Sequence, residues 1–155
     1  MDARVLFLGE APGAQEDRVG RPFVGSSGRS LDAAIASLGL APDEVGILNL
    51  IKCRPPHNRF DRNAWGACRP HLEHQLELLR PDWIVTLGAN ALRAFLPSAR
   101  VLTGFSGVPI LADGRRIYPM LHPAAMMHNP RLRPRWEQEL EGFRQLLHPP
   151  MKEAL

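Results

Sequence analysis

The stretch LFLGEAPGAQED, residues 6–17, decides the fold because it places a tight turn at the end of a buried strand. Residues 4–8 (RVLFL) form a short apolar run that is typical of a strand covered on both faces. Gly9 ends this run, and Glu10 follows on a turn that Gly13 closes. The first strand therefore delivers a carboxylate at its carboxyl end.

Apolar runs of the same kind alternate with helical segments along the rest of the chain. Pro70 is expected to interrupt the second of these helices, and Ser26 or Ser27 to cap the first. The alternation predicts an α/β fold with a parallel sheet covered by helices on both faces. The predicted strands are 4–8, 46–50, 83–87 and a hairpin of 108–111 with 116–120, and the predicted helices are 26–38, 61–80, 89–95 and 135–147.

The length and composition predict a single domain, residues 1–155. The protein is expected in the cytoplasm and not in a membrane. No apolar run approaches the length of a membrane span, and the N-terminus lacks the features of a signal peptide. The net charge is +3, with 19 basic residues of which only Lys52 and Lys152 are lysine. An excess of basic residues that consists mostly of arginine suits phosphate binding. A genome that favours arginine codons would give the same composition without any such function.

Distinctive polar residues follow three of the predicted strands. Glu10 follows the first strand, Asn49 ends the second, and His122 comes after residues 116–120. Because ligand sites of open parallel sheets lie beyond the carboxyl ends of the strands, these side chains are expected to share one crevice. A carboxylate, an amide and an imidazole together can activate water, read a donor–acceptor pattern and stabilise a developing anion.

Two loops add groups that suit a nucleotide ligand. Phe23, in GRPFVG (20–25), can stack on a flat base, although such a ring more often packs in a core. KCRPPHNR (52–59) is a basic loop stiffened by two prolines, which suits a phosphate clamp or an ordinary solvated surface. The common nucleotide fingerprints G-x-x-x-x-G-K-[ST] and G-x-G-x-x-G are absent.

Three motifs together resemble those of the bacterial and archaeal uracil-DNA glycosylases of family 4: GEAPGAQEDRVGRPFVGSSG, LNLIKCRPPHNR and LHPAAMMHNP. They occur in the family's order and spacing between Leu6 and about Leu147. The resemblance implies a three-layer α/β/α fold with a central four-stranded parallel sheet and a DNA groove across the strand ends. It also implies a monomer that acts on uracil-containing DNA and hydrolyses the bond between uracil and deoxyribose, leaving an abasic site.

The resemblance assigns roles to residues at matching positions. Glu10 is similar to the residue that positions and activates water, and His122 to the histidine that stabilises the leaving base. Phe23 is similar to the ring that stacks on flipped uracil, and Asn49 to the amide that pairs with its Watson–Crick edge. Cytosine reverses uracil's pattern of donor and acceptor, so a fixed Asn49 amide would reject it.

Further residues are expected to contact the substrate or the DNA. Gly9 lies beside the base pocket, and Glu16 is expected to exclude thymine by crowding the 5-position, unless it is only an exposed loop charge. Met126, or Met127 next to it, is the expected wedge that fills the gap left by the flipped base, unless both simply pack under a loop. The expected DNA contacts are Lys52, Arg54, Asn58, Arg59 and Arg131.

The cysteines depart from the family pattern. Family 4 enzymes usually hold a four-iron–four-sulfur cluster with four cysteines, but only Cys53 and Cys68 are present here. An intact cluster is therefore not expected, and no other cofactor is predicted. Two alternatives stay open: a zinc site in which His71 and His74 join Cys68, or a chain that is a shortened product of a longer one.

Two other functions are compatible with the sequence. One is a nucleic-acid-binding relative that has lost turnover, although such a protein would not need Glu10, Asn49 and His122 together. The other is a glycosylase with a shifted preference for another deaminated base, such as hypoxanthine or xanthine.

Overall fold

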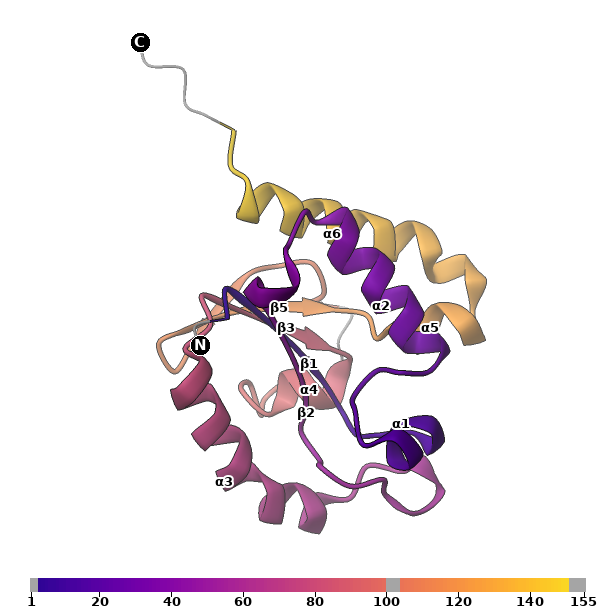
Figure 1. The fold of residues 1–155 in the computed structure, drawn as a ribbon. Helices are drawn as coiled ribbons and strands as arrows, with labels where there is room; N and C mark the ends of the chain where they lie inside the picture. The colour runs from indigo at the N-terminus through magenta and orange to yellow at the C-terminus, as the bar shows by residue number, and fades with distance from the viewer. Residues whose placement is uncertain (1–2, 100–103, 151–155) are drawn as a thin grey trace.

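The centre of the molecule is a five-stranded sheet with the strand order β2-β1-β3-β5-β4 (Figure 1). The computed structural model describes residues 3–99 and 104–150. Four strands run parallel, and β4 pairs antiparallel with β5. The predicted α/β fold with four parallel strands is confirmed, and the predicted hairpin adds a fifth strand at the edge. The strands are β1 (Val5–Gly9), β2 (Val45–Asn49), β3 (Trp83–Leu87), β4 (Ile110–Ala112) and β5 (Arg115–Met120).

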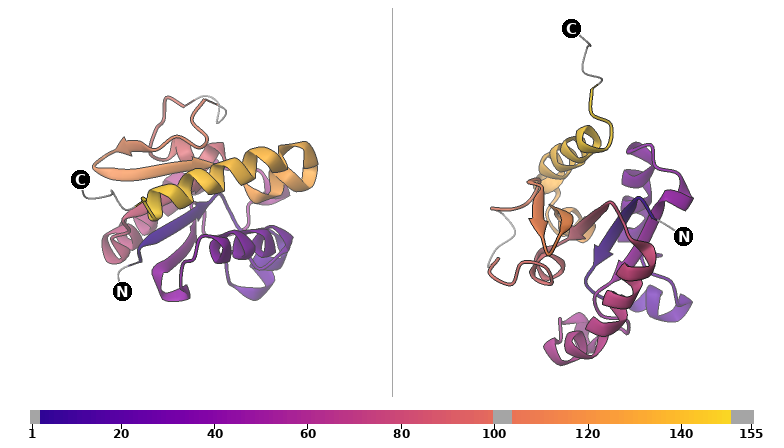
Figure 2. Two further views of the ribbon diagram at one scale, coloured as in Figure 1. Left: turned by 90° about the horizontal axis from the view of Figure 1, so that it is seen from above. Right: turned by 90° about the vertical axis from the view of Figure 1, so that its left-hand side faces the viewer.

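Helices cover both faces of the sheet (Figures 1 and 2). Helices α2 (Ser26–Ser37), α5 (Pro123–His128) and α6 (Arg133–Leu147) pack on one face. Helices α3 (Arg62–Leu79) and α4 (Ala89–Arg93) pack on the other. The remaining elements are α1 (Ala14–Val19) and the short 3₁₀ helices η1 (Pro42–Glu44), η2 (Pro56–Asn58) and η3 (Pro130–Leu132).

Alternate residues of β1 fill the two halves of the core. Val5 and Phe7 pack with α2 and α6, whereas Leu6 and Leu8 pack with α3 and α4. All four are buried, because β1 lies between β2 and β3 with helices on both sides. This position explains why residues 5–8 are a continuous apolar run rather than an alternating one.

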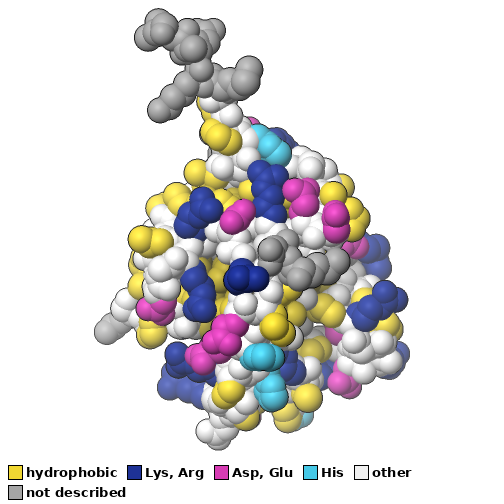
Figure 3. Space-filling model, turned by 60° about the vertical axis from the view of Figure 1, so that its left-hand side comes forward, with side chains coloured by type: hydrophobic (Ala, Val, Ile, Leu, Met, Phe, Trp, Pro, Cys, Tyr) yellow, Lys and Arg dark blue, Asp and Glu magenta, His cyan; other side chains and the backbone are white. Residues whose placement is uncertain are grey.

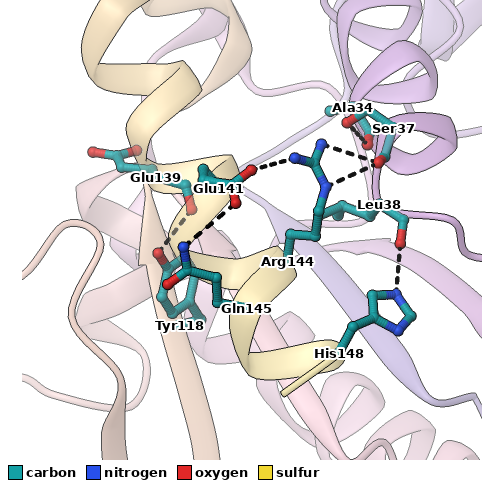
Figure 4. A network of polar contacts seen from close by, with 9 residues as sticks. All are labelled: Ala34, Ser37, Leu38, Tyr118, Glu139, Glu141, Arg144, Gln145 and His148. Atoms are coloured by element: carbon teal, nitrogen blue, oxygen red, sulfur yellow. Dashed lines mark hydrogen bonds and ion pairs between the residues drawn. The ribbon is translucent and has the colours of Figure 1, made fainter. Parts of the chain in front are cut away.

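Helix α6 is tied to the end of α2 by side chains near its own C-terminus (Figure 4). The Arg144 guanidinium donates from Nε and Nη2 to the Ser37 carbonyl at 3.2 and 3.1 Å. The His148 ring nitrogen Nε2 lies 3.0 Å from the Leu38 carbonyl oxygen. These contacts supply partners for carbonyls that a helix leaves unsatisfied at its C-terminal end.

Two predicted details of the helices are wrong. Pro70 does not interrupt α3, which is continuous: the proline is exposed, and the buried Leu72 and Leu76 hold the following turns against the sheet. Neither Ser26 nor Ser27 caps α2, because Gly25 is the N-cap residue and no side chain caps it. Two other predictions are confirmed. Gly39, which has a left-handed backbone, follows the end of α2, and the carboxylate of Asp61 caps the start of α3.

On the face shown in Figure 3, Lys and Arg side chains are interspersed with Asp and Glu side chains. This part of the surface therefore carries both signs of charge rather than one continuous basic patch. Among the described residues, none of the helices combines the length and the apolar character that a membrane span requires.

Candidate active site

A cavity of about 560 Å³ opens beyond the carboxyl ends of β1, β2 and β5. Glu10, Asn49 and His122 all line it, although the sequence separates them widely. Phe23 and Asn58 line it as well. The structure thus brings together the carboxylate, the amide, the imidazole and the aromatic ring in one site.

Glu10 is held by both its main chain and its carboxylate. The Ile51 N–H donates to the Glu10 carbonyl at 3.0 Å, which extends the pairing of β1 with β2 past the strand ends. The carboxylate oxygen Oε2 accepts a hydrogen bond of 3.0 Å from Nδ2 of Asn90, a residue in α4. Glu10 is therefore a positioned group rather than a solvated loop charge.

Asn49 lies in close contact with the end of β1. Its side chain is buried, and its Oδ1 makes no hydrogen bond within the described residues. Asn49 pairs with Gly9 across the parallel ladder, and a Cβ on Gly9 would lie 2.6 Å from that oxygen. Gly9 is thus required because the amide of Asn49 and the Phe23 ring both approach its Cα.

Phe23 is presented by a loop that Glu16 holds in place. The Phe23 backbone is left-handed (φ +53°), which is unfavourable for a residue with a side chain. One Glu16 oxygen accepts the N–H groups of Val24 and Gly25 at 3.1 and 3.0 Å, and the other accepts that of Gly13 at 3.1 Å. Glu16 therefore ties the Phe23 loop to the turn after β1.

The ionised form of Glu16 is favoured by these hydrogen bonds. Burial raises the pKa of its carboxyl, but the main-chain N–H groups outweigh burial and leave the pKa below its usual value. Glu16 lines the cavity as well, so it is not simply an exposed loop charge.

His122 is the N-cap residue of α5. Its Nδ1 accepts the Ala124 N–H at 3.1 Å, so the neutral ring carries its proton on Nε2. Burial lowers the pKa of His122 to about 4, so the imidazole is neutral at neutral pH. The ring stacks on Phe23, with 5.7 Å between ring centroids and 28° between planes. His122 can therefore act as a neutral hydrogen-bond donor.

The segment before His122 is fixed by a buried carboxylate from α6. Oε2 of Glu139 accepts the Leu121 N–H at 2.8 Å. Its other oxygen accepts from Ser106 and, at 3.1 Å, from Arg135. Glu139 thus positions the main chain that carries His122.

Lys52 points inward rather than towards solvent. Its ammonium donates to the Asn49 carbonyl at 2.7 Å and to Oε1 of Gln75 at 2.6 Å. Burial lowers the pKa of Lys52. The lysine predicted as a phosphate contact is instead half-buried between β2 and α3, because it satisfies a carbonyl next to the cavity.

The other predicted DNA contacts are exposed. Arg54, Asn58 and Arg59 lie in the loop that follows β2, and Nε of Arg54 donates to Oδ1 of Asn58 at 2.9 Å. His57 and Asn58 both have left-handed backbones, which turns this loop sharply at the cavity rim. Arg131 is exposed just after α5.

The two methionines of α5 differ in position. Met126 is 8% exposed and packs in the core with α2 and α6, so it is not available as a wedge. Met127 is 51% exposed, and its sulfur lies 3.8 Å from the Ser27 hydroxyl. The structure therefore offers Met127, the alternative, and not Met126.

Cys53 and Cys68 differ in their surroundings. Cys53 is exposed, and Sγ of the half-buried Cys68 accepts the Lys52 N–H at 3.4 Å. His71 and His74 are exposed on α3. Within residues 3–99 and 104–150, no three His, Cys, Asp or Glu side chains are grouped so that they could hold a metal ion.

Sequence reasoning missed several residues that support the site. Asn90 could have been found, because it follows β3 at the same edge of the sheet as Glu10, Asn49 and His122. The local sequence around Glu139 shows only Arg135 as a partner, four residues before it, because Ser106 and Leu121 lie in segments far away in the sequence. Helix α1, which carries Glu16, was also missed.

The fold and the site define an α/β protein whose polar cavity, with an aromatic ring on one wall, lies at the carboxyl ends of its strands. A family model described as the uracil DNA glycosylase superfamily matches residues 1–142. The chain therefore belongs to the uracil-DNA glycosylase superfamily.

Curated relatives place the chain more narrowly within that superfamily. The type-4 uracil-DNA glycosylase of Thermotoga maritima is 40% identical, over 83% of this chain and 69% of the relative. Those of Sulfurisphaera tokodaii and Saccharolobus solfataricus are each 36% identical, over 97% and 94% of this chain and 73% and 72% of the relatives. The resemblance to family 4 that the three motifs indicate is confirmed.

Replacing Gly9 by alanine tests the close approach of β1 to Asn49 and Phe23. The added methyl would lie 2.6 Å from Oδ1 of Asn49 and from Cζ of Phe23. We expect the free energy of unfolding, measured by urea denaturation, to fall by about 1–3 kcal/mol. The control is Gly66→Ala in α3, which meets no atom within 4 Å and should raise stability by about 0.5–1 kcal/mol. Equal effects of the two substitutions would rule out a special role for Gly9.

The lowered pKa of His122 predicts a pH dependence of stability. The folded-state value of about 4 lies below the ordinary value of 6.5. Between these values the unfolded chain binds the proton more readily, so the free energy of unfolding should fall as the pH drops from 6.5 to 4. His122→Asn keeps a good N-cap residue without an ionisable ring. Its stability should decline less steeply over that window in denaturation series, and parallel declines would contradict the assignment.

Proposed function

We propose that this chain removes uracil from DNA by flipping the nucleotide into the cavity and hydrolysing its glycosidic bond. The observation that carries the proposal is the shared cavity, in which Glu10, Phe23, Asn49 and His122 meet. Its type-4 relatives are named uracil-DNA glycosylases. Extruding a nucleotide costs on the order of a few kcal/mol, and stacking on Phe23 would return about 1–3 kcal/mol.

Asn49 would recognise the base. Its buried Oδ1, which has no partner among the described residues, would accept the N3–H of uracil, while its amide N–H would donate to O4. An unpaired buried acceptor is costly, so a ligand that supplies the donor gains affinity over one that does not. Cytosine presents an acceptor at N3 and would leave this oxygen unpaired.

The reaction would separate charge between the sugar and the base. Glu10 would hold the attacking water and stabilise the cation-like sugar with its carboxylate. The neutral His122 would donate from Nε2 to O2 of the departing uracil anion. A neutral donor stabilises the anion without first having to take up a proton from solvent.

The exposed residues around the cavity would bind the DNA strand. Arg54, Arg59 and Arg131 would contact phosphates, with Asn58 orienting Arg54 through their hydrogen bond. Met127 would take the role of the wedge, because it is the exposed methionine of α5. Glu16 would act by shaping the loop that carries Phe23.

A four-iron cluster does not fit the residues of this chain. Such a cluster takes four thiolates, whereas the 155 residues contain two cysteines, one exposed and one accepting a main-chain N–H. No step of the proposed reaction passes through a metal. The expectations of a single domain, a monomer and a cytoplasmic location stay predictions.

The proposal is tested with an oligonucleotide that contains a single uracil. Alkali treatment after incubation should cleave the strand at the uracil, and a matched strand with thymine should stay intact. Glu10→Ala and His122→Ala should each lower the single-turnover rate by about 100-fold or more. Strands with hypoxanthine or xanthine in the same position test a shifted preference. DNA binding without base release would identify a non-catalytic relative and overturn the proposal.

The different environments of Lys52 and Arg59 predict different effects on DNA binding. Arg59→Met should reduce the slope of log Kd against log salt concentration by about 1, because it removes one phosphate contact. Lys52→Met should leave that slope unchanged, but lower the free energy of unfolding by about 1–3 kcal/mol by removing two hydrogen bonds. A reduced slope for Lys52→Met would show instead that this lysine reaches the DNA.

A further inference from the structure

A chain of hydrogen bonds leads from the Glu10 carboxylate into α4. Nδ2 of Asn90 donates to Oε2 of Glu10 at 3.0 Å. Oδ1 of Asn90 in turn accepts from Nη1 of Arg93 at 3.0 Å, and Nε of Arg93 donates to the Ala99 carbonyl at 2.9 Å. Three segments of the chain, at the ends of β1 and β3 and after α4, are thus connected through side chains.

Arg93 fixes the orientation of the Asn90 amide. An amide can present either its oxygen or its NH₂ group to a neighbour, whereas a guanidinium only donates. Because Arg93 occupies the oxygen of Asn90, the NH₂ group is turned towards Glu10. Both side chains are half-buried, so water screens these contacts less than it would at the surface.

We infer that Asn90 is a positioning residue for catalysis, which holds Oε2 of Glu10 while Arg93 holds Asn90. This inference rests on the proposed function, since Glu10 is the group that would hold the water. With Oε2 engaged, Oε1 is left as the acceptor that orients the attacking water towards the sugar. Asn90 does not line the cavity with Glu10, so it acts through the carboxylate and not by touching the base.

Single-turnover kinetics of uracil release test this role. Asn90→Leu removes the donor at similar volume and should lower the rate constant by about 10- to 100-fold, because a misplaced catalytic group loses much of its effect. The Kd for uracil-containing DNA should change less than about twofold, since Asn90 contacts neither base nor phosphate in this arrangement. Asn63→Leu, which alters an exposed asparagine of α3, is the matched control and should leave both values unchanged.

A double-mutant cycle separates positioning from a general structural effect. If Asn90 acts through Glu10, Asn90→Leu should change the rate less than about twofold when Glu10 is already alanine. A merely structural role would lower the rate in both backgrounds. A full effect of Asn90→Leu in the Glu10→Ala background would therefore overturn the inference.

The isosteric Asn90→Asp provides a second readout that does not depend on folding with leucine. A carboxylate at position 90 would keep Arg93 as its partner but would offer Glu10 an acceptor in place of a donor. The two carboxylates would then repel each other, so the acid limb of the rate–pH profile should move up by about 1 pH unit. The other ionisable groups that line the cavity are Glu16, His122 and His128, and these variants leave them unchanged. An unmoved acid limb would contradict the inference.

The outcomes distinguish this inference from the function on which it rests. If the wild-type chain releases no uracil, the proposed function fails. If the wild-type chain is active and Asn90→Leu releases uracil at the wild-type rate, the function stands and only the positioning role is rejected.

Discussion

The parallel hydrogen bonding of β1 with β2 continues one step beyond the strands, and the cavity is arranged around this extension. The Leu50 N–H donates to the Gly9 carbonyl and the Ile51 N–H to the Glu10 carbonyl, both at 3.0 Å. These two bonds fix the main chain of Glu10 relative to Asn49, so neither side chain depends on a loose loop for its position. Such rigidity suits a site in which donors and acceptors must already point at their targets before the substrate arrives.

Two buried or half-buried carboxylates hold the remaining walls of the cavity in the same way. Glu16 accepts main-chain N–H groups of the loop that carries Phe23, and Glu139 accepts the N–H of the residue before His122. Loop N–H groups have no ladder or helix partner, and an ionised acceptor satisfies them more strongly than a neutral one does. The aromatic ring and the imidazole are thus anchored from α1 and α6, at opposite ends of the chain.

Much of the fold and the centre of the site could be predicted from the sequence, because strand ends are easy to recognise. The rule that ligands lie at the carboxyl ends of parallel strands brings Glu10, Asn49 and His122 together without further information. The direction of a side chain at a loop or helix end is harder to predict, because packing decides it. Met126 and Met127 are identical in type, but only the contacts of α5 with α2 and α6 show which one is buried.

The hydrogen bonds that Glu16 accepts from the Phe23 loop have a consequence for where residues can be inserted into the chain. The Glu16 carboxylate accepts the N–H groups of Val24 and Gly25, so the segment between residues 16 and 24 is a loop held together at both ends. Residues 17–21 of this loop are exposed. Gly20 has open space around it, whereas a Cβ on Gly28 would lie 1.7 Å from the Phe23 carbonyl oxygen. Extra residues near Gly20 would enlarge a surface loop whose ends stay fastened. The same insertion a few positions later would displace the aromatic wall of the cavity. The exposed loop of residues 17–21 is therefore the place to attach a probe or a fusion close to the cavity without disturbing the cavity.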